Sequence, residues 1–189
     1  AMNSVSIMTG NEKMQTYFSY ANTTAKGIID SNKLQKHNLT LRETANFFNE
    51  RLKLDGNANL MTQTIKNSPS SGGYYLNPLV NVYGFPRGMD MAPYRDNFET
   101  YDTDRNMNLQ NWYVTNEDGT ISEWDQNPYW IKNRVTNNNK RYRAMAALTA
   151  SVEATEWLTI QARGNVDYVS DKFENKMYAS TSPNIAGTY

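Results

Sequence analysis

The chain has 189 residues, no cysteine, and 19 basic against 19 acidic residues, so its formal net charge is zero. This composition excludes disulfides, thiolate metal sites and cysteine nucleophiles, and gives no electrostatic reason to expect a nucleic-acid partner. No run in the sequence approaches the roughly 18 apolar residues of a transmembrane helix.

Long segments in which apolar and polar residues alternate predict β-strands, because successive side chains of a strand point to opposite faces. In chain order these segments are 2–8, 13–24, 35–47, 51–65, 141–153 and 157–170. Most exceed the usual strand length of about 5 or 6 residues and fit the roughly 9 to 11 residues of a strand that crosses a bilayer. We therefore predict an all-β fold of long antiparallel strands, a segment of a large outer-membrane β-barrel with a long external loop.

The connections between these strands alternate in length. Short turns at 9–12, 48–50 and 154–156 alternate with a loop at 25–34, a much longer one at 66–140, and the segment after 171. Outer-membrane barrels have tight periplasmic turns and long external loops. The pattern predicts barrel strands and hairpins over 1–65, an extracellular loop over 66–140, and over 141–189 a barrel hairpin followed by the start of the next external loop.

Several separated motifs resemble one transporter family. They are Asn77–Asp90 (NPLVNVYGFPRGMD), Gln126–Ile131 (QNPYWI) and Thr155–Gln161 (TEWLTIQ), together with Lys26–Ile29 and Leu39–Arg42 on the early strands. In this order, over essentially the whole chain, they resemble the barrel of SusC/RagA-type TonB-dependent transporters of Bacteroidetes.

The resemblance implies a larger parent protein in the bacterial outer membrane, with a plug domain that precedes the barrel. It also implies a SusD-like surface lipoprotein and the TonB complex as partners, membrane lipid around the barrel, and a glycan or peptide nutrient as substrate. The chain shows no amino-terminal export signal and begins within a predicted strand. We therefore expect it to be a piece of such a transporter.

The long loop is rich in aromatic residues, whose flat faces stack on sugar rings or peptide side chains. The candidate ligand-binding residues are Trp112, Tyr113, Trp124 and Trp130. The alternative is that these rings fold the loop on itself or contact the lipoprotein lid. A turn at 117–120 also predicts a hairpin between 112–115 and 121–124.

We predict neither an enzyme nor a cofactor. Glu123 and Asp125 would share one face of a strand, and nothing places a second acid across a substrate. The segment Asp102–Asn108 begins like a calcium loop, but it lacks the glycine at the sixth position and the final glutamate. His37 has no second histidine or cysteine to complete a metal site.

A soluble all-β carbohydrate-binding or interaction module is the alternative function, since it too would use alternating strands and exposed aromatic residues. Alanine, glycine and threonine occupy many apolar-face positions, where they are too small to fill the core of a sandwich. Aromatic residues near the strand ends would either form the girdle of a membrane interface or pack between strands. They are Tyr17, Phe18, Tyr20, Trp157 and Tyr168.

Overall fold

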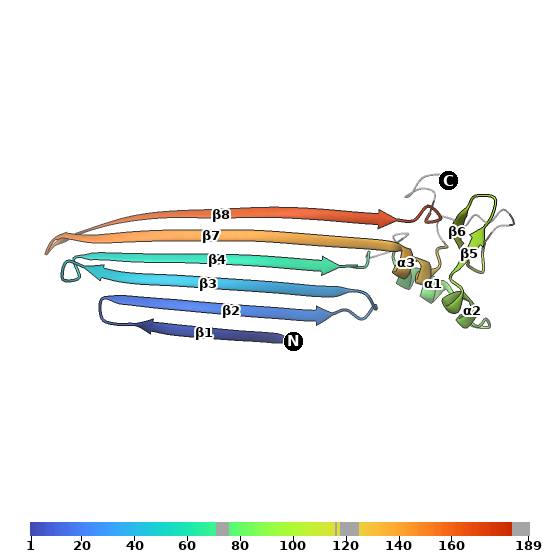
Figure 1. The fold of residues 1–189 in the computed structure, drawn as a ribbon, viewed down its shortest axis with the longest axis horizontal. Coiled ribbons are helices and arrows are strands. Elements are labelled where there is room, and N and C mark those ends of the chain that lie inside the picture. Colours follow the sequence, from blue (N-terminus) through green and yellow to red (C-terminus); the bar gives the residue numbers. More distant parts are fainter. Residues whose placement is uncertain (71–75, 116, 118–124, 183–189) are drawn as a thin grey trace. The chain divides into compact units, whose positions relative to one another are not determined.

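The computed structural model describes residues 1–70, 76–115, 117 and 125–182, and this part of the chain is dominated by β-strands (Figure 1). The long strands are β1 (Met2–Gly10), β2 (Met14–Lys26), β3 (Lys33–Phe47), β4 (Leu52–Lys66), β7 (Val135–Thr155) and β8 (Leu158–Met177). The predicted all-β fold of long antiparallel strands is confirmed.

The six long strands form one sheet in the order β1-β2-β3-β4-β7-β8, in which each long strand pairs with the next long strand along the chain. In the first hairpin Val5 lies opposite Tyr20 and Ile7 opposite Phe18. The sheet is open, with β1 and β8 at its edges.

The last two strands are longer than the alternation predicts. β7 has 21 residues and β8 has 20, whereas the sequence pattern marked only 141–153 and 157–170. Beyond these limits lie polar residues such as Asn137 and Lys176 on both faces, so hydrophobic periodicity gives no signal there. Strand pairing through the backbone does not need that periodicity.

Two tight turns have unusual backbone conformations. Gly10 has φ +151°, and a Cβ there would lie 2.2 Å from the carbonyl oxygen of Met14, so the position requires glycine. The next residue, Asn11, accepts hydrogen bonds from the backbone N–H groups of Lys13 and Met14, both at 2.9 Å. Between β3 and β4, Phe48–Glu50 all have positive φ, so this turn stores backbone strain.

The chain forms two compact units. The first comprises 1–25, 33–65 and 139–172, and the second comprises 26–32, 66–138 and the segment from 173 onward. In the six long strands, all of whose residues the structure describes, no residue is buried. The sheet of the first unit is thus a single layer without a hydrophobic core of its own.

The second unit contains three short helices and a small hairpin in its described residues. The helices are α1 (Pro78–Gly84), α2 (Ala92–Asp96) and α3 (Pro128–Arg134), and the hairpin strands are β5 (Glu99–Asp102) and β6 (Met107–Gln110). Asn77 and Asn127 cap α1 and α3, and a proline follows each cap at the first helical position. The buried hydrophobic residues of the described chain all lie here: Leu109, Trp112, Trp130 and Ile131.

The hairpin lies at 99–110 rather than at the position predicted from the turn at 117–120. Residues 112–115 form no strand, and 121–124 lie outside the described residues. Asp102 accepts hydrogen bonds at 2.9 Å from the backbone N–H groups of Asp104 and Arg105, which forms the hairpin turn. Hydrogen bonds from the backbone and side chain of Arg105 lower the pKa of Asp102. The start of the calcium-like motif thus builds a turn.

Within the residues that the structure describes, no group of three or more histidine, aspartate or glutamate side chains could hold a metal ion. No described helix is long and apolar enough to cross a membrane.

Candidate functional site

The two faces of the first unit's sheet differ in chemistry. Side chains at even positions of β3 and odd positions of β4, β7 and β8 form one face, as their cross-strand hydrogen bonds show. We call this the polar face. The opposite, apolar face carries exposed Ile7, Phe18, Leu60, Leu148 and Ile160.

The polar face contains a hollow of about 820 Å³, which we take as the candidate site. Most of the side chains that line it carry amide, hydroxyl or charged groups. They are Met8, Tyr17, Thr40, Arg42, Lys53, Asp55, Asn57, Ala58, Asn59, Thr149, Ser151, Gln161 and Arg163. The hollow reaches across all six strands, so sheet pairing brings together residues more than 150 positions apart in the sequence, from Met8 to Arg163.

Hydrogen bonds between β3 and β4 fix one side of the hollow. Arg42 Nη2 donates to Asp55 Oδ2 at 2.6 Å, and the Thr44 hydroxyl donates to the same oxygen at 3.1 Å. Asn59 Nδ2 donates to the hydroxyl oxygen of Thr40 at 2.8 Å. These contacts hold the Asp55 carboxylate in an ion pair, which suits it to ordering the wall rather than to acting as a free base.

The other side of the hollow comes from β7 and β8. Gln161 Nε2 donates to the Ser151 hydroxyl oxygen at 3.1 Å, with Arg163 beside them. Arg163 and Lys53 form no ion pair with the described residues, whereas Arg42 is paired with Asp55. Three cationic side chains against one carboxylate give the lining a net charge of +2. The arrangement can bind polar ligands through hydrogen bonds and favours negative charge.

Of the candidate ligand-binding residues, Trp112 and Trp130 lie in the core of the second unit. Trp112 is 2% exposed, and its ring centroid lies 5.2 Å from that of Phe85 and 5.4 Å from that of Tyr94. Trp130 is 0% exposed, and its indole N–H donates to the Thr181 hydroxyl oxygen at 3.0 Å. This burial matches the alternative in which the aromatic rings fold the loop.

The other two candidates are placed differently. Tyr113 is half-buried beside Trp112, with ring centroids 5.0 Å apart, and burial raises the pKa of its phenol. Trp124 lies outside the described residues. Ligand contact through Tyr113 or Trp124 stays a prediction, and none of the three candidates that the structure describes lines the hollow of the polar face.

The core of the second unit also contains a network of amide side chains that sequence reasoning missed. Gln110 Nε2 donates to Gln126 Oε1 at 2.8 Å and to the Ser180 carbonyl oxygen at 2.7 Å. Its Oε1 accepts from the Asn127 backbone N–H at 3.0 Å. The network ties β6 to the residues before α3 and to the segment after β8.

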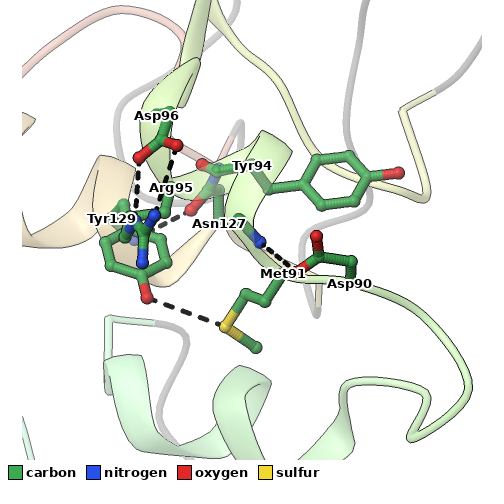
Figure 2. Close-up of polar contacts among 8 residues, drawn as sticks. Asp90, Met91, Tyr94, Arg95, Asp96, Asn127 and Tyr129 are labelled. Carbon is green, nitrogen blue, oxygen red and sulfur yellow. Dashed lines mark hydrogen bonds and ion pairs between the residues drawn. The ribbon is translucent and has the colours of Figure 1, made fainter.

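Asn127 extends this network toward α2. Its Nδ2 donates to the carbonyl oxygen of Tyr94 at 3.0 Å, and its Oδ1 accepts from the backbone N–H of Tyr129 (Figure 2). The same Nδ2 also donates to the carbonyl oxygen of Asn111 at 2.6 Å. The Tyr129 hydroxyl in turn donates to the sulfur of Met91 at 3.8 Å. An Asn-Pro pair before a helical segment is a cap signal, so this residue could have been assigned from sequence.

A half-buried ion pair holds α3 to the hairpin. Arg134 Nε and Nη2 donate to the two carboxylate oxygens of Glu99 at 2.7 and 2.6 Å, and the guanidinium lies 4.7 Å from the ring centroid of Tyr178. These hydrogen bonds to Glu99 raise the pKa of Arg134.

Arg134→Lys should lower the stability of the second unit by about 1 kcal/mol, because lysine keeps the charge but cannot form two parallel hydrogen bonds. Hydrogen exchange of the β5 and β6 amides would measure the loss. Arg95→Lys is the matched control, since the Arg95–Asp96 pair is exposed and should contribute much less. Equal losses in the two variants would contradict the role given to the Glu99 pair.

A scan against models of known protein families and a search of curated proteins each found no match to this chain.

Proposed function

We propose that the chain forms part of the wall of a large outer-membrane β-barrel that imports nutrients, of the SusC/RagA-type TonB-dependent kind. The observation that carries the proposal is the single-layer sheet of the first unit, which has one polar, hollowed face and one exposed apolar face. A water-soluble sheet covers its apolar face with a second layer. In a barrel wall, lipid covers that face and the lumen hydrates the other.

The length of the apolar face supports this proposal. In β8 the apolar positions run without interruption from Leu158 to Tyr168. At a rise of about 3.3 Å per residue this run is roughly 33 Å long, and at a tilt of about 45° it covers roughly 23 Å of membrane thickness. Outer-membrane barrels have an apolar band of about 25 Å. In β7 the corresponding run extends from Tyr142 to Ala154.

The proposal gives each part of the chain a place in the membrane. The tight turns after Gly10, Phe47 and Thr155 belong on the periplasmic side, and the segment 66–138 belongs outside the cell. The polar face lines the lumen, where its amide, hydroxyl and cationic groups meet a hydrated nutrient such as a glycan or peptide. A SusD-like lipoprotein and the TonB complex would be partners of the parent protein.

Single cysteines along β8 would test the proposal, since the chain has no cysteine of its own. The full chain, carrying an environment-sensitive fluorophore at one position from 159 to 167, is folded into vesicles that contain brominated lipid. We expect strong quenching at even positions such as Ile160→Cys and Val166→Cys. At odd positions such as Gln161→Cys and Asp167→Cys we expect little quenching, because in a barrel wall these side chains face the lumen.

The alternative, a soluble carbohydrate-binding or interaction module, predicts a different result. In a soluble module the even positions would be covered by protein, and brominated lipid would quench none of them. Equal quenching at even and odd positions would also contradict a barrel wall, because it would indicate nonspecific adsorption to the vesicle.

A further inference from the structure

Lysines end the apolar face of the first unit on the side of the long loop. Three strands of the unit each carry one there, namely Lys33 near the start of β3, Lys140 in β7 and Lys172 in β8. We call these three residues the lysine rim. Strands β2 and β4 likewise end on Lys26 and Lys66. Each of these lysines is an even number of residues from the exposed large apolar residues of its strand, and so belongs to the same face.

Hydrogen bonds on neighbouring residues fix the direction of these side chains. Arg141 forms a two-bond ion pair with Asp171 at 2.7 and 2.8 Å on the polar face. Lys140 and Lys172 are the next residues along their strands, so they point to the apolar face. On β3, Arg42 marks the polar face, and Lys33 is an odd number of residues from it, so Lys33 also points to the apolar face.

Tyrosines separate the apolar residues from the rim. On the apolar face of β7 and β8, Tyr142 and Tyr168 are the last large side chains before Lys140 and Lys172. On β2, Tyr20 has the corresponding place, and its hydroxyl pairs with Nδ1 of His37 at 2.7 Å. Along the apolar face, towards the loop side, aliphatic residues are followed by tyrosine and then by lysine. Side chains follow one another in this way at a membrane interface, where tyrosine lies at the headgroups and lysine extends beyond them.

The charge of the rim is not neutralised by the described residues. None of its three lysines forms an ion pair there, and Lys172 is exposed while Lys33 and Lys140 are half-buried. The nearest acid in sequence on the same face of β8, Glu174, is paired with Lys176. At the opposite ends of the strands the turns carry acids and cations side by side, Glu12 next to Lys13 and Glu50 next to Arg51. The lysine rim therefore has no counterpart on the turn side.

We propose that the lysine rim binds the phosphate groups of anionic lipid headgroups in the leaflet on the loop side. This inference rests on the proposed function, because the rim meets headgroups only if the apolar face meets lipid. Ammonium groups on flexible side chains reach phosphates a few ångströms beyond the apolar band. The rim would thereby fix both the depth and the orientation of the wall in the membrane.

Binding of the full chain to vesicles tests the rim. The vesicles consist of phosphatidylcholine alone or of phosphatidylcholine with phosphatidylglycerol, and co-flotation gives the partition coefficient. We expect the unaltered chain to prefer the anionic vesicles, and added salt to weaken this preference. Lys33→Gln/Lys140→Gln/Lys172→Gln should reduce the preference about fivefold per lysine, roughly a hundredfold in total, while binding to phosphatidylcholine stays the same.

The matched control removes three cations outside the rim: Lys13→Gln/Lys36→Gln/Arg51→Gln. It changes net charge equally but alters the turn side and the polar face, so it should keep the preference. Equal losses in both variants, or no preference in the unaltered chain, would contradict the proposed role of the lysine rim but not the proposed barrel wall. Failure to bind either kind of vesicle would overturn both the rim and the proposed function.

Discussion

Leu148→Arg should weaken insertion of the chain into a phosphatidylcholine bilayer by about 2 to 4 kcal/mol, the cost of a cation at the lipid-facing midplane of a barrel. Leu148 lies at the centre of the apolar run of β7, with 57% of its surface exposed. On the neighbouring strand, a Cβ at Gly56 would lie 3.7 Å from its side chain, which places both residues on the apolar face. The free energy of insertion, measured by reversible unfolding of the chain from vesicles in denaturant, is the readout.

Ala147→Arg is the control for this prediction. It adds the same charge one residue earlier in the same strand, where the side chain points to the polar face. In a barrel wall the added guanidinium stays hydrated there, and insertion should change by less than about 1 kcal/mol. If the two variants lose insertion equally, the two faces of β7 do not differ in environment and the proposed barrel wall is wrong.

The sheet was predictable from sequence because its signal is repeated. Leu52, Leu54 and Leu60 on β4, or Leu158, Ile160 and Val166 on β8, repeat with a period of two over a length that no helix pattern imitates. The polar face could be predicted in the same way, since the residues between them are charged or amide-bearing. What alternation cannot give is the register between strands, so the pairing of Arg42 with Asp55 needed the structure.

The second unit was less predictable, because its contacts connect residues that are distant in sequence and polar in type. Gln110 is 70 residues from Ser180, and a glutamine has no tendency that marks it for burial. Trp112 and Trp130 are candidates both for ligand contact and for folding the loop on itself, and in the structure they are among the few buried large apolar residues of the second unit. An aromatic residue in a long loop is a signal for both roles, and composition cannot separate them.

The two units are therefore stabilised by different means. The first has continuous strand pairing but no buried residue in its six strands. Its apolar face can therefore be shielded from water only by something other than the sheet itself. The second has buried tryptophans and a hydrogen-bonded amide network within its own segment. A substitution in the second unit should thus lower its stability in water as well as in lipid.

Trp130→Ala should destabilise the second unit by about 3 to 5 kcal/mol, the usual cost of truncating a fully buried tryptophan. The indole of Trp130 is 0% exposed, and its N–H bonds to Thr181, so truncation leaves both a cavity and an unpaired hydroxyl. Because α3 begins next to Asn127, the loss should spread into the amide network. Hydrogen exchange of the α3 and β6 amides, measured residue by residue, would show it as faster local opening.

Trp157→Ala provides the contrast within the same chain. Trp157 is 82% exposed at the turn between β7 and β8, so truncation there removes few contacts and should leave exchange in α3 and β6 unchanged in water. If the amides of α3 stay fully protected after Trp130→Ala, this indole does not stabilise the core, and ligand contact becomes the better-supported role for Trp130. If both variants open α3, the second unit depends on the turn of the sheet, which would contradict its separate stabilisation.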